Sequence, residues 1–171
     1  DAAERRRTVN HLAQERHRLQ MLLEHSPDCI YFKDLQSRFL VLSPSMARMF
    51  GFKKVEEVLG KTDFDIFTKE HAQPAYDDEQ TIIRTGIPLI NKEEKETWPD
   101  GHVTWASSTK VPFHDPSGEI IGIFGISRDI TASRVAAAEI EHLAFYDPLT
   151  GLPNRRLLIN SLKLFIVPAL A

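Results

Sequence analysis

The spacing of hydrophobic and polar positions predicts a helix at the start of the chain. Between Arg5 and Glu24 there is no glycine or proline, and apolar residues recur at alternating steps of three and four if one arginine occupies a position of the stripe. The stripe is narrow and suits a two-helix coiled coil, although the arginine weakens it. Packing against the helix's own domain is the alternative. The expected seam residues are Val9, Leu12, Leu19 and Leu23.

Two short β-prone runs follow this helix. The helix is expected to end at Pro27, because proline cannot continue it. Residues 30–32 and 39–42 favour strands, and residues 34–37 between them are typical of a hairpin turn. The pattern therefore predicts two antiparallel strands.

Short helices are expected in the middle of the chain. Ser43 is the expected N-cap of the first, and single helical turns are expected at residues 55–59 and 63–67. Thr68 is the expected N-cap of a longer helix that ends at Gly86.

Three longer strand-like segments complete the pattern, at residues 87–96, 102–113 and 119–128. Turn sequences containing proline, glycine and aspartate separate them, which predicts a meander. Two strands, a group of helices and three more strands must form one antiparallel sheet whose apolar face the helices cover. The predicted fold is therefore α+β in two layers, with a hydrophobic space that could hold a small ligand.

The middle strand of the meander is the expected cavity wall. Period two places Val103, Trp105 and Val111 on one face, together with the hydroxyls of Ser107 and Thr109. Trp105 and Ser107 are the first candidates for ligand contacts, because a buried indole N–H or hydroxyl needs a partner.

Composition and charge narrow the range of functions. The chain has 171 residues, of which 42% are hydrophobic and 26% charged, which is typical of a soluble globular protein with room for one core. The formal net charge of -3 provides no basic field, so nucleic-acid binding is not expected.

Cysteine use and hydropathy favour a cytoplasmic location. Cys29 has no partner for an internal disulfide, and no cysteine–histidine spacing suggests a metal site. No run approaches the roughly 20 apolar residues that span a bilayer. Because the chain does not begin with methionine, we expect it to be part of a longer protein, which could be anchored in a membrane upstream.

Several short motifs accompany this order of elements. They are Tyr31-Phe32-Lys33-Asp34, Arg38-Phe39, Phe50-Gly51-Phe52, Leu59-Gly60-Lys61-Thr62-Asp63-Phe64-Asp65, Asp100-Gly101, Lys110-Val111-Pro112 and the run from Gly122 to Thr131. Together, the element order and the motifs resemble a PAS sensor domain over residues 26–131. The resemblance implies the PAS fold, a five-stranded antiparallel sheet covered on one face by short helices. It also implies either binding of haem, flavin or a small metabolite between helices and sheet, or dimerisation and relay without a ligand.

Neither of the two large cofactors matches this sequence. PAS photoreceptors of the LOV type carry a reactive cysteine in an Asn-Cys-Arg-Phe run, whereas Cys29 precedes the first strand, so flavin photochemistry is not expected. His71 is the candidate axial ligand for haem, but haem-binding relatives place that histidine near Ala75 or Tyr76. Haem is therefore not expected, and a solvated or capping role for His71 is the alternative.

For a small organic ligand, the expected lining consists of apolar and aromatic side chains with one hydroxyl. An ordinary hydrophobic core is the alternative interpretation of the same residues. The candidates are Phe32, Leu42, Met46, Met49, Phe50, Phe67, Tyr76, Ile83, Trp105, Ser107 and Phe124.

A signal is expected to leave the domain at the end of the last strand. Thr131 is expected to cap an exit helix over residues 132–146, and Asp129 is expected to hold the strand to it, with Arg134 as a partner. Ile140 belongs to a thin apolar stripe on this helix, which together with the N-terminal helix predicts a homodimer. Docking of the exit helix on its own sheet is the alternative.

Residues 147–156 resemble the opening of a GGDEF diguanylate cyclase domain. The resemblance implies a parent protein that makes cyclic di-GMP, but this chain lacks the metal carboxylates and the Gly-Gly-Asp-Glu-Phe turn and is not itself expected to be an enzyme. An apolar tail around Pro168 departs from the family, so residues 147–171 are expected to be only the start of that domain. A histidine kinase is the alternative output, but His142 is followed by Leu143 and not by an acidic residue.

The expected organisation is an N-terminal helix at 1–25, a PAS domain at 26–131, a signalling helix at 132–146 and a partial GGDEF domain at 147–171. The sequence thus predicts a sensory module that binds a small ligand or relays changes in a dimer to a cyclase. A dimerisation module without a ligand is the alternative.

Overall fold

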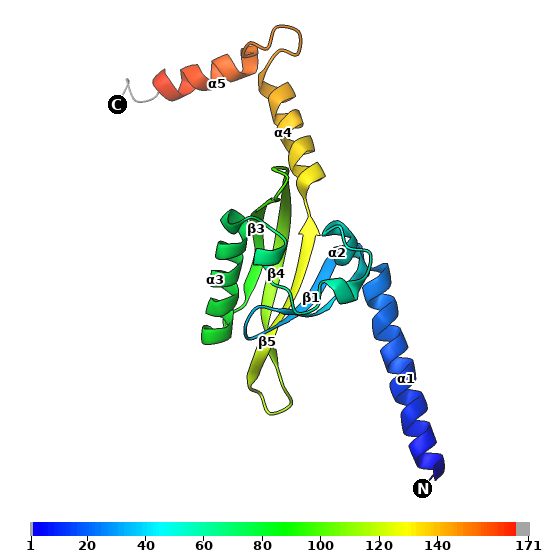
Figure 1. Ribbon diagram of the computed structural model, residues 1–171. Helices are drawn as coiled ribbons and strands as arrows, with labels where there is room; N and C mark the ends of the chain where they lie inside the picture. Colours follow the sequence, from blue (N-terminus) through cyan, green and yellow to red (C-terminus); the bar gives the residue numbers. More distant parts are fainter. Residues whose placement is uncertain (1, 167–171) are drawn as a thin grey trace. The chain divides into compact units, whose positions relative to one another are not determined.

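The computed structural model of the protein describes residues 2–166, which form two compact units that divide after Asp129 (Figure 1). The first unit holds a sheet and its helices, and the second holds two helices and the loop between them. The predicted tail at residues 167–171, with Pro168, lies outside the described residues.

The order of elements confirms the predicted α+β pattern. The first unit consists of α1 (Ala2–His25), β1 (Cys29–Asp34), β2 (Phe39–Leu42), α2 (Pro44–Met49), the 3-10 helices η1 (Val55–Glu57) and η2 (Asp63–Asp65), α3 (Lys69–Thr85), β3 (Leu89–Thr97), β4 (Val103–His114) and β5 (Ile120–Asp129). The second unit consists of α4 (Thr131–Phe145) and α5 (Arg155–Ile166).

The five strands form one antiparallel sheet in the order β2-β1-β5-β4-β3. The last strand, β5, therefore lies in the centre, between β1 and β4. Tyr31 of β1 and Lys110 of β4 stand opposite the same residue of β5, Gly125, on its two sides. This register brings side chains of β1 and β4, which are far apart in the sequence, to one face of the sheet.

Helix α3 covers this face of the sheet (Figure 1). It ends where predicted, because Gly86 takes the left-handed conformation, with φ of 70°, that favours glycine after a helix. The buried residues of α3 form one stripe along the helix: His71, Ala72, Ala75, Glu79 and Ile82.

The hydrophobic core fills part of the space between the helices and the sheet. Aromatic side chains dominate one end of it, where the Phe50 and Phe67 rings lie 5.5 Å apart and the Phe67 and Trp98 rings 4.6 Å apart. The buried members of the core are Cys29, Tyr31, Phe39, Leu42, Met46, Ala47, Val58, Ile66, Phe67, Ile82, Trp98 and Ile123.

The two predicted N-caps of the first unit tie their helices to strands. Ser43 and Thr68 stand at the N-cap positions of α2 and α3. The hydroxyl of Ser43 accepts a hydrogen bond from the backbone N–H of Ile30 (3.2 Å), which joins α2 to β1. The hydroxyl of Thr68 bonds to that of Thr97 at the end of β3. Both residues thus position helices over the sheet.

The exit helix begins one residue earlier than the capping prediction requires. Ile130 occupies the N-cap position of α4 and Thr131 is its first residue, so the prediction that Thr131 caps the helix is wrong.

Among the described residues, no helix has the length and hydropathy of a membrane span.

The loop of the second unit is a turn followed by a helix. The Asp147 carboxylate accepts hydrogen bonds from the backbone N–H groups of Leu149 (3.1 Å) and Thr150 (2.8 Å). Asn154 then caps α5, because its side-chain oxygen accepts a bond from the backbone N–H of Leu157 (3.1 Å).

Candidate functional site

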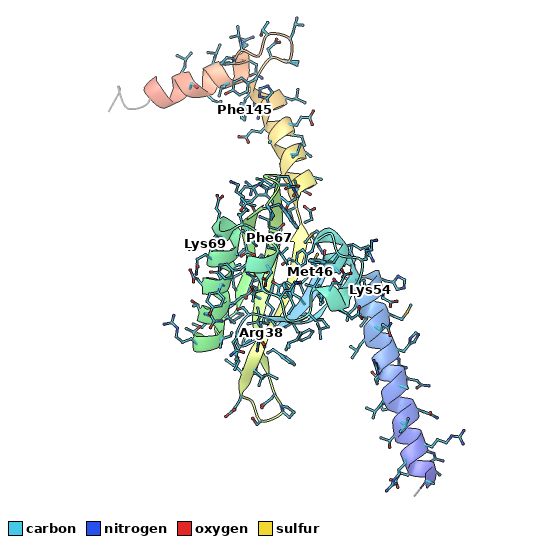
Figure 2. The ribbon with its side chains drawn as sticks, in the orientation of Figure 1. Arg38, Met46, Lys54, Phe67, Lys69 and Phe145 are labelled. Atoms are coloured by element: carbon cyan, nitrogen blue, oxygen red, sulfur yellow. The ribbon has the colours of Figure 1, made fainter. Side chains whose placement is uncertain are left out.

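A small cavity lies between the helices and the sheet of the first unit. It leaves about 20 Å³ for the centre of a water molecule, slightly more than a single water requires. Met46 and Phe67, labelled in Figure 2, are two of its few apolar members. Most of the lining is polar or charged. The lining residues are Tyr31, Lys33, Met46, Met49, Asp63, Phe67, His71, Ala75, Glu79, Glu94, Glu96, Ser108, Lys110 and Ser127.

Lys33 is the centre of the charged lining. Its side chain is 2% exposed, and Nζ donates hydrogen bonds to Asp63 Oδ2 (2.6 Å) and to Glu79 Oε1 (2.7 Å). Burial alone would lower the pKa of Lys33, but Asp63 and Glu79 outweigh burial and raise it above its usual value. Lys33 is therefore a buried cation that joins β1, η2 and α3.

Lys110 is a second buried cation, from β4. Its Nζ donates to Glu94 Oε1 (3.2 Å) and lies 3.9 Å from Glu79 Oε1. Burial opposes its charge, but Glu94 and Glu79 raise its pKa. In turn, burial would raise the pKa of Glu94, whereas Lys110 holds it below its usual value. The two therefore form a charged pair inside the protein.

Glu79 is the least satisfied member of the cluster. The whole residue is 0% exposed, and its Oε2 has no hydrogen-bond partner among the described residues. Burial raises the pKa of Glu79, and the neighbouring Asp63 adds to this effect, while Lys33 and Lys110 oppose it. The effect of burial outweighs the pairing with Lys33 and Lys110, so the pKa of Glu79 stays above its usual value. Buried carboxyl oxygens are nearly always hydrogen-bonded, so a molecule in the cavity is the expected hydrogen-bond partner of Glu79 Oε2.

A chain of hydrogen bonds connects the cavity to the aromatic end of the core. The indole N–H of Trp98 donates to Thr104 Oγ1 (2.8 Å), and the Thr104 hydroxyl donates to Glu96 Oε2 (2.5 Å). Burial raises the pKa of Glu96 to about 7, and the nearby Glu94 adds to this effect. Glu96 therefore changes its charge near neutral pH.

The sheet side of the cavity depends on a close approach between β1 and β5. A Cβ on Gly125 would lie 2.2 Å from Cζ of Tyr31, so the Tyr31 ring occupies the space above this glycine. Beside the ring, the hydroxyls of Ser108 and Ser127 bond to each other at 2.9 Å. The resulting wall carries three hydroxyl groups that can donate or accept hydrogen bonds.

His71 is part of the cavity wall, so the alternative that it is a solvated histidine is wrong. It is buried, and its Nδ1 donates to the backbone carbonyl of Lys95 at 3.1 Å, because a carbonyl oxygen only accepts. Burial lowers the pKa of His71. Its ring packs 4.4 Å from that of Phe67.

The structure brings only some of the predicted residues to the cavity. Met46, Met49 and Phe67 line it. Leu42, Phe50 and Ile83 belong to the surrounding core. Tyr76 is half-buried and packs beside Phe64, with 6.0 Å between the rings.

Four predicted lining residues lie on the opposite face of the sheet, and their assignment to the cavity is wrong. Phe32 alternates with the lining residues Tyr31 and Lys33 along β1. Its partner Phe124 shares its face, with 4.9 Å between the rings. By the same alternation, Trp105 and Ser107 face away from Ala106, Ser108 and Lys110, which are buried on the cavity side of β4.

The error has a simple physical origin. The period of β4 is as predicted, but the more apolar of its two faces is the outer one. The cavity face carries Lys110, whose charge is compensated by carboxylates from β3 and α3 that are distant in sequence. Lys33, Asp63 and Lys110 all occur in the short motifs that resemble a PAS domain, and these motifs are the signal in the sequence that could have indicated the charged site.

The arrangement is suited to binding a small polar molecule. Its size and its charged lining do not fit haem or flavin, which need large, mainly apolar pockets. Among residues 2–166, no group of three or more histidine, cysteine, aspartate or glutamate side chains could hold a metal ion. What the site offers is a set of fixed donors and acceptors shielded from water.

Comparisons with known proteins agree with this fold. The methanogenesis regulatory histidine kinase FilI of Methanothrix harundinacea is 30% identical over 75% of this chain and 14% of its own length. A diguanylate cyclase of Vibrio cholerae is 29% identical over 74% of this chain and 40% of its own length. The chain therefore spans less than half of either relative.

A solved structure and a family match complete the comparison. The VqmA–ligand–DNA complex of Vibrio cholerae superposes with a TM-score of 0.58 at 26% identity, over 69% of this chain and 55% of that one. Residues 23–135 match the family described as the PAS fold. The chain therefore belongs to the PAS-fold family.

Proposed function

We propose that the chain is the sensory module of a larger signalling protein, and that it detects a small polar molecule in the charged cavity. The observation that carries this proposal is the buried, charged lining between α3 and the sheet. Burying five or more ionisable side chains is costly, and well-packed hydrophobic residues of the same volume often stabilise a fold equally well or better. A binding site explains why the charges are there. The VqmA structure, which contains a ligand, supports a ligand-binding role for the shared fold.

We further propose a diguanylate cyclase as the output domain. Residues 147–156 resemble its entry segment, and the bonds of Asp147 and Asn154 stabilise a compact turn before α5. The cyclase relative supports this output. The histidine kinase relative favours a kinase as the second candidate. On the first proposal, residues 147–171 are the start of the output domain, and residues 26–131 and 132–146 are the sensor and the signalling helix.

The signal is proposed to leave through Asp129, Thr131 and Arg134 into α4 of a homodimer. Apolar side chains on α1 and α4 support pairing, since Val9, Leu12, Leu19 and Ile140 are between 61% and 69% exposed. Such stripes are typical of helices that pair with another copy. A cyclase suits this control, because joining two nucleotides requires two loaded domains to meet. A dimerisation module that relays a signal without a ligand is the competing role.

Native mass spectrometry tests the sensory role. The chain purified from its own host should carry a mass excess that is absent from Ala75→Leu, which fills the cavity from α3. The matched control Ala136→Leu places the same side chain on the exposed surface of α4 and should keep the excess. If the parent and both variants all show the mass of the polypeptide alone, ligand sensing is contradicted. The remaining role would then be relay through a dimer without a ligand.

The output is tested on the whole protein that contains this chain. Incubation with GTP should give cyclic di-GMP, measured by chromatography. Autophosphorylation with ATP and no cyclic dinucleotide would replace the cyclase proposal with the kinase.

A further inference from the structure

We propose that the cavity selects a small molecule that carries an N–H or O–H donor and no negative charge, with Glu79 Oε2 as the atom that accepts the donor's hydrogen bond. This inference rests on the proposed sensory function and adds the chemical class of the ligand. It assigns a role to the one buried side-chain atom without a partner in the part of the chain that the structure describes.

The position of Glu79 fixes which of its atoms is open to a ligand. It lies in the second half of α3, and it lines the cavity. Its Oε1 is held by Lys33 at 2.7 Å, with Lys110 at 3.9 Å, so this end of the carboxylate is occupied. The carboxylate cannot rotate freely without losing the bond to Lys33. In the ionised carboxylate, Oε2 is consequently presented as a fixed acceptor, shielded from water.

The charge of the lining excludes anions. Two ammonium groups, of Lys33 and Lys110, face the carboxyl groups of Asp63, Glu79, Glu94 and Glu96. When Glu79 is ionised, which its contacts with Lys33 and Lys110 favour, the carboxylates outnumber the cations even with Glu96 protonated. An anionic ligand would add like charge in a region of low dielectric, which costs far more than the same approach in water. A neutral donor or a cation meets no such penalty.

The remainder of the wall sets a second requirement. The hydroxyls of Tyr31, Ser108 and Ser127 lie on the sheet side, and the ammonium groups of the two lysines can donate. A ligand that donates to Glu79 can therefore accept at its other end. The space as it stands fits about one water, so a ligand of a few heavy atoms requires the flexible side chains of Met46 and Met49 to move aside. Small amides and amines have this combination of size and polarity.

A single bound water is the competing occupant. The cavity is just large enough for one, and a water would donate to Oε2 without any selectivity. The two occupants differ in what they predict, because a water-filled cavity does not distinguish an amide from a carboxylate of the same shape.

Acetamide and acetate are matched probes, since they have almost the same shape and differ in the donor and the charge. We would titrate each into ¹⁵N-labelled protein at constant ionic strength and follow the backbone amides of Ser108 and Ser127. A probe with four heavy atoms binds no tighter than about 40 µM, so the titration extends into the millimolar range. Acetamide should give saturable shifts at these amides and acetate should not.

Glu79→Gln replaces the acceptor Oε2 with an NH2 group, which donates hydrogen bonds at the same position. Acetamide affinity should fall at least tenfold, and acetate should gain affinity. Glu70→Gln, the same substitution at an exposed position of α3, is the control and should behave as the parent. If Glu79→Gln does not fold, as judged by circular dichroism, the comparison of acetamide with acetate in the parent protein still tests whether the cavity selects a neutral donor.

Several results would overturn the inference. Equal shifts with both probes, or none with either, would mean that the cavity holds water and does not select a donor. Loss of acetamide binding in the control Glu70→Gln would mean that the loss in Glu79→Gln does not arise from Glu79 Oε2. If mass spectrometry finds a bound anion, the ligand class is wrong while the sensory function stands; if it finds no ligand, the sensory function fails as well.

Discussion

Replacing Lys33 with methionine tests whether the buried charges are mutually dependent. Methionine has a similar length, so packing is largely kept, but Asp63 and Glu79 lose the cation that bonds to both at 2.6 and 2.7 Å. Their side chains are only 10% and 1% exposed, so water cannot replace it. Breaking a buried pair in this way costs about 3–5 kcal/mol. Lys110 remains 3.9 Å from Glu79, which places the expected loss in the free energy of unfolding near the lower end, at about 3 kcal/mol.

The pH dependence of this loss provides a second criterion. In the parent, Lys33 helps to hold the pKa of Asp63 below its unfolded value of 3.8, so this stabilisation is present above that pH and is lost as the pH falls through the lower folded value. Without Lys33, burial raises the pKa of both carboxyls in the folded state. The variant then regains stability by protonation as the pH falls. The difference between parent and variant should therefore shrink from pH 7 to pH 5.

Urea denaturation followed by circular dichroism measures both quantities. Lys92→Met is the matched control, because Lys92 pairs with Asp78 at the surface and is 41% exposed. Its loss should not exceed about 1 kcal/mol. A Lys33→Met protein as stable as the Lys92→Met control, or a penalty that grows as the pH falls, would refute the reasoning.

Three further expectations follow from the structure. Gly125→Ala should lower the free energy of unfolding by about 1–3 kcal/mol in urea titrations, because the new Cβ would overlap the Tyr31 ring; an unchanged midpoint would show that the ring can move away. Because burial raises the folded pKa of Glu96 from 4.5 to about 7, its contribution to stability is fully present below pH 4.5 and is lost as the pH rises through 7. Glu96→Gln should remove up to about 3 kcal/mol of that fall, and urea titrations with the same pH slope in both proteins would contradict it. Leu19→Arg combined with Ile140→Arg should give a monomer in analytical sedimentation, whereas a parent that is already monomeric would remove the case for pairing.

The elements of the sheet domain could be predicted from local patterns. The turn at residues 34–37, the stop at Gly86 and the three-stranded meander all depend on short-range chemistry, namely turn residues and strand periodicity. The structure confirms each of them within a few residues. The capping prediction for Thr131 failed because Ile130, which cannot cap with its side chain, already stands at the helix boundary.

The cavity could not be predicted in the same way. Its polar lining depends on pairs such as Lys33 with Glu79, which are 46 residues apart, and on Lys110 with Glu94 across two strands. Taken alone, each of these residues is typical of a solvated surface, and only the fold shows that its charge is compensated. For the same reason the aromatic residues Phe32 and Phe124, which are typical of a core, were assigned to the wrong face.

The hydrogen-bond chain from Trp98 to Glu96 allows the intrinsic tryptophan fluorescence of the protein to report the charge of Glu96. The Trp98 indole bonds to the Thr104 hydroxyl, which in turn bonds to a carboxyl that gains or loses its proton near neutral pH. The emission wavelength of Trp98 should therefore follow the charge beside the cavity without any attached dye. The second tryptophan, Trp105, lies on the outer face of the sheet, and replacing it with phenylalanine would leave Trp98 as the only tryptophan that emits.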